Sequence, residues 1–246
     1  MLDGKTEFRN FFIILNQDKW FKKIFDISQL ESLVGKTKHN SNDNWEYSIS
    51  RLKFRKIDLQ RHVRPELIKP DDDATLELEV GFNGFYAALD NKIYDHINSL
   101  AVRITINMEN IDEELNITER NCLWHLDKHD STKKVNSSHP LYHFEFGGSN
   151  KTETEGFSYG HFILLDTPRI MHPPLDIVLA IDFIIKHFYS YSDSQTLTNK
   201  QQYKDIIKNA QYRLWRPYYL SIVSQYHDFN SEYEFDKQFI KNIFEC

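Results

Sequence analysis

Histidine and acidic side chains gather in one stretch of the chain, Trp124 to Gly148, with the sequence WHLDKHDSTKKVNSSHPLYHFEFGG. It holds four histidines, two aspartates and a glutamate between aromatic residues. Successive side chains of a strand point to opposite faces, so His125, Asp127 and His129 share one face, and His143 and Glu145 share a face of the next strand. If the two strands are neighbours and their apolar faces coincide, we expect all five side chains to converge.

Two kinds of chemistry suit these side chains. Imidazole nitrogens and carboxylate oxygens bind divalent metals, so we predict a Mn²⁺, Mg²⁺ or Zn²⁺ site, with Fe²⁺ also suited, at His125, Asp127 and His129. Such a metal activates water or binds a phosphate. Without a metal, two histidines divide the roles of general base and general acid in phosphodiester cleavage. Both alternatives predict hydrolysis, with the catalytic residues His125, Asp127, His143 and Glu145.

The same pattern also has a purely structural explanation. A strand with one solvent-facing side carries polar residues at every second position, and a histidine beside an aspartate then forms a surface hydrogen bond. The stretch matches no established metal motif such as H-E-x-x-H. His139 precedes Pro140 and is expected in a turn. A site and a polar outer face are therefore both open alternatives.

A basic run, RLKFRKIDLQRHVR at residues 51–64, contains Asp58 as its one acidic residue. Arg51, Lys53 and Arg55 share a predicted strand face, which makes a basic stripe suited to the phosphates of RNA or DNA. Alternatively, the apolar stems of these side chains cover the edge of a sheet. We therefore predict these three residues as substrate-binding groups, with edge covering as the alternative.

Arg169 lies in DTPRIMHPP, between a predicted strand and a predicted helix. A guanidinium group at such a junction binds a carboxylate or a phosphate through two parallel hydrogen bonds. The alternative is a loop-stabilising ion pair with Asp166 or Asp176. Arg169 is therefore a fourth predicted substrate-binding residue.

Composition limits the classes of function. The chain has 246 residues, 40% of them hydrophobic, and a formal charge of -6, which argues against a general polyanion binder. Cys122 and Cys246 suggest neither a disulfide framework nor a metal-binding pair.

The start of the chain has no signal-peptide pattern, and the most apolar segment is too short for a membrane span, so we expect a cytoplasmic protein with no membrane partner. The glycine motifs of phosphate-loop NTPases, dinucleotide dehydrogenases and serine hydrolases are missing from the sequence.

Hydrophobic periodicity predicts mainly strands in the first two thirds of the chain. Residues 17–34 fit an amphipathic helix. Period-two alternation then predicts strands, with a change of phase between Ile49 and Leu52. These strands lie at 45–57, from 76 onward, and at 100–108, 121–129, 141–146 and 160–166. Their short connections require antiparallel pairing.

Helices are predicted in the last third. Residues 175–189 form a buried helix, 190–200 a linker, and 201–229 a long helix that Pro217 kinks or divides, before a short terminal helix. The predicted class is α+β: an antiparallel β-sheet in the N-terminal and central region, packed helices, and a helical C-terminal region. We expect one domain over 1–246, comprising an N-terminal helical segment (1–40), the sheet (45–170) and the helical region (173–246).

The order of motifs between Trp124 and Tyr189 resembles uncharacterised prokaryotic families found near toxin and phage-defence genes. The resemblance rests on WHLDKHD, HPLYHFEFGG, DTPRI and an apolar helix ending IDFIIKHFY. It implies a conflict-system protein, either a nuclease-like effector or a subunit of a larger complex. It carries over His125, Asp127, His143 and Arg169 as candidate positions.

Three functional hypotheses follow from these patterns. The first is a phosphodiester hydrolase that cleaves RNA or DNA at the histidine-rich hairpin. The second is a non-catalytic interaction subunit of a defence or regulatory complex, or a homo-oligomer, that docks a protein partner through C-terminal aromatic residues. Those residues are Trp215, Tyr218, Tyr219, Tyr226 and Tyr233, which alternatively pack the helices onto the sheet. The third is a small-ligand binder with a closed pocket near Arg169.

Overall fold

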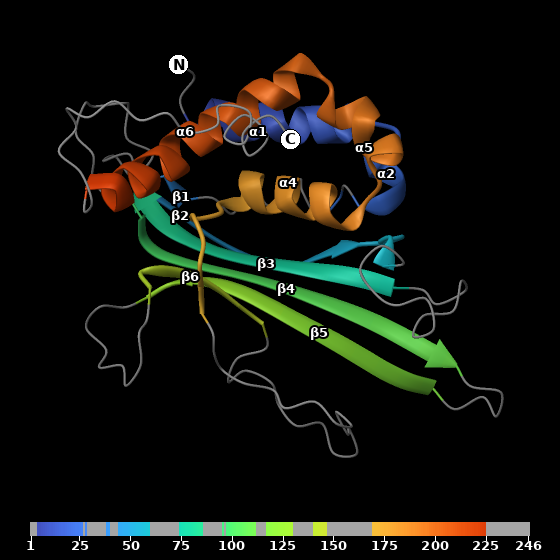
Figure 1. Cartoon of the computed structure of the whole chain (residues 1–246). Coiled ribbons are helices and arrows are strands. Elements are labelled where there is room, and N and C mark those ends of the chain that lie inside the picture. The colour runs from blue at the N-terminus through green and yellow to red at the C-terminus, as the bar shows by residue number, and fades with distance from the viewer. Residues whose placement is uncertain are drawn as a thin grey trace, which may run out of the picture.

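The computed structural model describes residues 4–26, 28, 38–39, 44–59, 74–85, 95, 97–111, 117–129, 140–146 and 169–224. Within them, seven strands form one antiparallel sheet in which the spatial order of the strands is their order along the chain (Figure 1). The strands are β1 (Lys38–His39), β2 (Asn44–Phe54), β3 (Ala74–Phe85), β4 (Ile97–Ile111), β5 (Ile117–Lys128), β6 (Tyr142–Phe146) and β7 (Ile170–Met171). The predicted α+β class with an antiparallel sheet is confirmed.

The predicted change of phase in β2 is a β-bulge. The pairing of β2 with β3 shifts between Ile49 and Leu52, so Ile49 and Leu52 are both buried although three positions separate them. Arg51 sits in the bulge with a φ of 58°, in the left-handed region. The bulge therefore keeps the apolar side chains of both halves of β2 on one face of the sheet.

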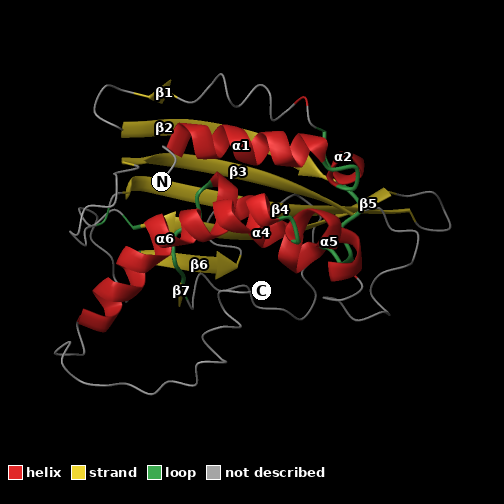
Figure 2. Cartoon of the chain, turned by 90° about the horizontal axis from the view of Figure 1, so that it is seen from above, coloured by secondary structure: helices red, strands yellow, loops and turns green. Residues whose placement is uncertain are grey.

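All the described helices lie on that apolar face (Figures 1 and 2). They are α1 (Gly4–Gln17), α2 (Phe21–Ile24), α4 (Ile177–Phe188), α5 (Tyr191–Thr198) and α6 (Gln201–Ser224). The opposite face of the sheet, which points away from these helices, is called the outer face below. Among the described residues, no helix has both the length and the apolar character that a bilayer span requires.

Helix α4 forms the centre of the helical layer. Asp176 caps its first turn by accepting a hydrogen bond from the Leu179 backbone N–H at 2.9 Å. Eight of the twelve α4 side chains are buried, including Asp182, whose carboxylate accepts a hydrogen bond of 2.8 Å from the Tyr203 hydroxyl of α6. Helix α6 also binds α1, because Arg213 lies 2.7 Å from the buried Glu7 carboxylate. These polar contacts fix the helices against one another above an apolar core.

Several helix predictions need correction. The first helix runs over Gly4–Gln17; within the predicted span 17–34, the described part contains the four-residue α2, and residues 25–26 after it are not helical. The predicted linker at 190–200 contains helix α5, which begins at a Ser190 cap. Helix α6 continues through Pro217. The predicted strand at 160–166 and the terminal helix lie outside the described residues.

Candidate functional site

Strands β5 and β6 position the predicted hairpin residues. They pair antiparallel, with Leu126 opposite Phe144, His125 opposite Glu145, and Asp127 opposite His143. Leu126 is fully buried in the core beneath the helices, so its neighbours on the strand point to the outer face. The predicted pairing of these strands with coincident apolar faces is confirmed.

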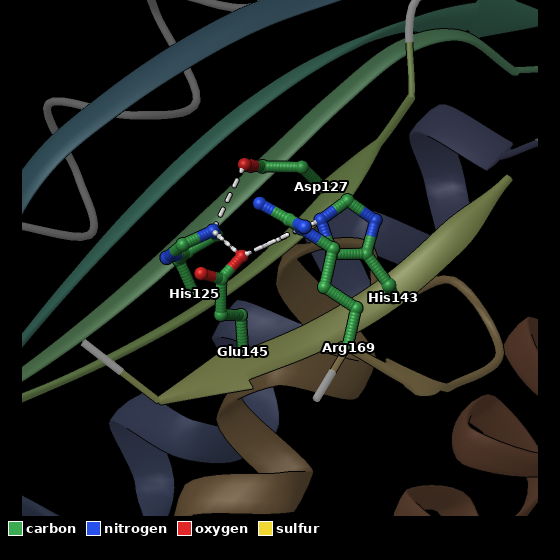
Figure 3. Close-up of polar contacts among 5 residues, drawn as sticks. All are labelled: His125, Asp127, His143, Glu145 and Arg169. Atoms are coloured by element: carbon green, nitrogen blue, oxygen red, sulfur yellow. Dashed lines mark hydrogen bonds and ion pairs between the residues drawn. The ribbon is translucent and has the colours of Figure 1, made fainter. Parts of the chain in front are cut away.

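Four side chains meet on the outer face and are called the hairpin cluster: His125, Asp127, His143 and Glu145 (Figure 3). The His125 Nε2 atom lies 3.4 Å from Asp127 Oδ2 and 3.3 Å from Glu145 Oε2. The His143 Nε2 atom lies 3.9 Å from the same Glu145 oxygen. Two histidines and two carboxylates therefore share one small volume.

The hairpin cluster is more deeply buried than a polar strand face exposed to solvent. His125, His143 and Glu145 are 8%, 2% and 4% exposed, while the Asp127 side chain is 39% exposed. Among the described residues, His125 Nδ1 and Glu145 Oε1 are buried without a hydrogen-bond partner. Burying a polar atom without a partner costs about 1–3 kcal/mol, so such atoms are usually paired with water or an ion.

Burial also changes the acid–base chemistry of Asp127. It raises the pKa of this carboxyl above the ordinary value of 3.8, whereas the positive charges of His125 and Arg103 act to lower it. Arg103 on β4 stands in register with His125, next to the cluster. Asp127 is thus the solvent-facing member of a cluster that is otherwise withdrawn from water.

Three members of the hairpin cluster have the geometry of a metal site. Donor atoms of His125, Asp127 and His143, called the metal triad below, all lie within 4.8 Å of one another. Ligand atoms about 2.1 Å from a tetrahedral Zn²⁺ ion are about 3.4 Å apart, so the most widely separated donors would have to move closer together when an ion binds. Two imidazoles and one carboxylate suit Zn²⁺, Mn²⁺ or Fe²⁺.

The metal triad differs from the predicted ligand set at one position. His129 follows the end of β5, where its backbone N–H donates to the Leu141 carbonyl at 2.7 Å, and it is not part of the described group of donors. His143 takes the third place because it stands directly opposite Asp127 on β6. Cross-strand neighbours are closer than residues two positions apart on one strand.

Arg169 contacts the hairpin cluster directly. Its Nε donates to Glu145 Oε2 at 3.1 Å, and its side chain is 18% exposed (Figure 3). Of the two alternative partners, Asp176 accepts a hydrogen bond from the Leu179 N–H at the start of α4. Asp166 lies outside the described residues. Arg169 therefore holds a carboxylate of the cluster, which the sequence did not predict.

The predicted basic stripe lies apart from the cluster. Arg51 and Lys53 belong to β2, and Arg55 follows the end of that strand; all three are exposed. Strands β3 and β4 separate β2 from β5. With neighbouring strands about 4.8 Å apart, the stripe is about 14 Å from the metal triad. A substrate that touches both must extend across the outer face.

Three of the five C-terminal aromatic residues, Trp215, Tyr218 and Tyr219, are described, and all three are partly buried. Trp215 and Tyr218 pack against the core, and the Trp215 indole N–H donates to the Pro174 carbonyl at 2.9 Å. Tyr226 and Tyr233 lie outside the described residues.

A cleft of about 320 Å³ lies between α6 and the start of β6. Arg169, near which the sequence predicted a pocket, is not among the described residues that line this cleft.

One functional candidate was missed from the sequence. Arg103 on β4 stands opposite His125, on the outer face, and its charge acts on Asp127. Its signal is its place in LAVRITINM, where it alternates with Val102 and Ile104 and so faces away from the core. Finding it requires the register between β4 and β5, which the alternation alone does not supply.

Comparison with known proteins adds no family to this description. The resemblance to prokaryotic conflict-system families therefore stays a prediction from short motifs. No protein-family model matches this chain, and no curated protein or solved structure is significantly similar to it.

Proposed function

We propose that the protein is a metal-dependent phosphodiester hydrolase whose metal ion binds to His125, Asp127 and His143. The observation that carries the proposal is the convergence of three donor atoms of suitable type within 4.8 Å, beside a buried carboxylate oxygen without a partner among the described residues. Three protein ligands leave a coordination position for water or substrate, as in catalytic zinc sites. Such a metal lowers the pKa of bound water and polarises a phosphoryl oxygen.

Glu145 and Arg169 supply the remaining roles in this proposal. The Glu145 carboxylate lies 3.3 Å from a ligand nitrogen, which places it to accept a proton from a water at the open position. Arg169 holds that carboxylate by an ion pair of 3.1 Å, so its orientation is set before substrate arrives. Asp127 is the most exposed of the three ligands, so solvent reaches the site beside this residue.

Phosphodiesters are the substrate class that the surrounding charges favour. Arg103 and Arg169 lie on either side of the hairpin cluster, and Lys53 is exposed on the same outer face. Cationic groups beside a metal stabilise the charge that develops on a transferring phosphoryl group. The net charge of -6 favours short or single-stranded substrates over long duplexes that need an extended basic surface.

Cleavage assays test this proposal. The wild-type protein, Asp127→Ala and the control Glu77→Gln, an acid on the outer face of β3, are incubated with bis(4-nitrophenyl) phosphate and with labelled single-stranded RNA and DNA. We expect Mn²⁺-dependent cleavage by wild type and Glu77→Gln, and loss of cleavage in EDTA or in Asp127→Ala. Cleavage that persists in EDTA would instead support the metal-free histidine mechanism. If folded, metal-supplied wild-type protein cleaves none of the three substrates, the hydrolase proposal is wrong.

A second candidate function, docking of a protein partner, is supported by a different observation. Four of the described apolar side chains with high exposure belong to the edge strands β6 and β7 or precede them, on both faces of the sheet: Leu141, Phe146, Ile170 and Met171. Exposed apolar residues at a sheet edge suit a protein partner that covers that edge. The mass of the native particle tests this candidate: a stable dimer or complex that Ile170→Glu dissociates supports docking, and a monomer contradicts it.

A further inference from the structure

The outer face carries two parallel rows of side chains that lead to the metal triad. Register places Glu79, Arg103, His125 and Glu145 side by side across β3 to β6, and this set is called the arginine row. The next row, called the small-residue row, contains Gly81, Ala101, Asp127 and His143. Each row therefore ends in members of the hairpin cluster.

The small-residue row leaves space beside the exposed ligand. Gly81 has no side chain, and the Ala101 methyl group is exposed. If Gly81 carried a Cβ atom, one described atom outside its chain neighbours would lie within 4 Å of it. That atom is the Ala101 carbonyl oxygen, at 3.9 Å. Asp127 is the ligand open to solvent, and Ala101 is its partner on β4. A molecule that reaches the metal from this side therefore crosses a part of the outer face that has no bulky side chain at Gly81 or Ala101.

Arg103 borders that surface and can change partners at low cost. Its Nη1 atom lies 3.3 Å from Glu79 Oε2, and both side chains are more than one-third exposed. Exposed ion pairs of this kind contribute about 0–1 kcal/mol. An anionic substrate oxygen can therefore compete with Glu79 for the guanidinium group, whereas Arg169 is held by a buried carboxylate.

We propose that substrate reaches the metal triad across Gly81 and Ala101, and that Arg103 binds a negatively charged phosphodiester oxygen of that substrate. The inference rests on the proposed function, because the metal triad supplies the end point of this path. It assigns Arg103 as a substrate-binding residue and the small side chain at Ala101 as a condition for access.

The test separates metal binding from binding of the phosphodiester. The variants are Ala101→Trp, Arg103→Ala, Arg103→Lys and a control, Glu77→Trp, which lies on the outer face of β3 four residues from Gly81, about 13 Å along the strand. Zn²⁺ affinity is measured by competition with a chromogenic chelator. Binding of dimethyl phosphate to the Zn²⁺-loaded proteins is then followed by phosphorus NMR.

We expect all four variants to bind Zn²⁺ with the affinity of wild type. Ala101→Trp and Arg103→Ala should each weaken dimethyl phosphate binding about tenfold, the effect of losing one well-placed contact. Arg103→Lys should retain part of the affinity, and Glu77→Trp all of it. If Ala101→Trp and Arg103→Ala bind Zn²⁺ and dimethyl phosphate as wild type does, the path is wrong while the metal site stands. If wild type binds no Zn²⁺, the proposed function fails and the inference fails with it.

Discussion

His125 on β5 and Glu145 on β6 stand directly opposite each other, with Nε2 and Oε2 3.3 Å apart on the face of the sheet that points away from the helices. The helices do not cover this face, yet both residues are buried. Each has a second buried polar atom without a hydrogen-bond partner among the described residues. Buried polar atoms are normally paired, so the open Glu145 oxygen is a place for a bound water or substrate group.

The identity of the third metal ligand gives the first prediction. His143→Ala should weaken Zn²⁺ binding by about a hundredfold or more, because even second-shell changes cost 10–100-fold. His129→Ala should leave the affinity unchanged, since His129 is outside the described donor group. Chelator competition on both variants measures this difference. If His129→Ala weakens Zn²⁺ binding more than His143→Ala does, the ligand set predicted from the sequence, with His129, is the correct one.

The ion pair between Glu145 and Arg169 gives the second prediction. Glu145→Ala should lower the free energy of unfolding by about 3 kcal/mol, because it leaves a largely buried guanidinium group without its carboxylate. The double variant with Arg169→Ala should cost less than the sum of the two single changes. Urea unfolding of the full cycle measures this coupling. The exposed pair of Arg103 and Glu79 is the control, with an expected coupling of at most about 1 kcal/mol.

Asp18 gives a prediction for the pH dependence of stability. Burial acts to raise the pKa of Asp18, but hydrogen bonds from Lys200, at 2.8 Å, and from the Phe21 and Trp20 backbone outweigh it, so the pKa lies below 3.8. A lowered pKa in the folded state stabilises the protein above pH 3.8, and this contribution disappears as the pH falls through the folded pKa.

The measurement for Asp18 is urea unfolding of wild type and Asp18→Asn as a function of pH. Asparagine keeps the acceptor oxygen but loses the charge. The difference in unfolding free energy should be largest above about pH 5 and should shrink as the pH falls below the ordinary pKa of an aspartate. A difference that does not change with pH would show that the charge of Asp18 contributes nothing.

The β2 bulge gives the fourth prediction. Arg51 has a φ of 58°, and the left-handed region costs an L-residue roughly 1 kcal/mol relative to glycine. Arg51→Gly should therefore stabilise the protein by up to about 1 kcal/mol, even though it removes a side chain. Lys53→Gly, at an exposed and regularly paired position of the same strand, should destabilise it by about 0.5–1 kcal/mol. Equal destabilisation by both changes would contradict the bulge.

The sheet was accessible from the sequence because its alternation is regular. Val102, Ile104 and Ile106 face the core as predicted, and the phase change between Ile49 and Leu52 is the observed bulge. The first helix was misplaced because the apolar side chains of residues 17–34 also fit helical spacing. Helix α5 was missed because its serine and threonine residues resemble a linker, while the Ser190 cap and buried Leu197 stabilise it.

The hairpin cluster could be predicted in membership but not in detail. Strand alternation placed His125, Asp127 and His129 on one face of their strand and His143 and Glu145 on one face of the next. Bringing the two sets together needed the further assumption that the strands pair with their apolar faces on the same side. Choosing His143 over His129 requires the exact register, and the pairing of Arg169 with Glu145 requires the position of β7 beside β6. Those are tertiary relationships, which no local pattern in the sequence specifies.

The central claim is that His125, Asp127 and His143 bind one divalent metal ion. Anomalous diffraction at the zinc absorption edge from crystals grown with Zn²⁺ tests it most directly. We expect one peak about 2.0–2.2 Å from His125 Nε2, an Asp127 oxygen and a His143 ring nitrogen. A Zn²⁺ ion held by other residues, or no peak at the hairpin cluster in protein saturated with Zn²⁺, would contradict the account.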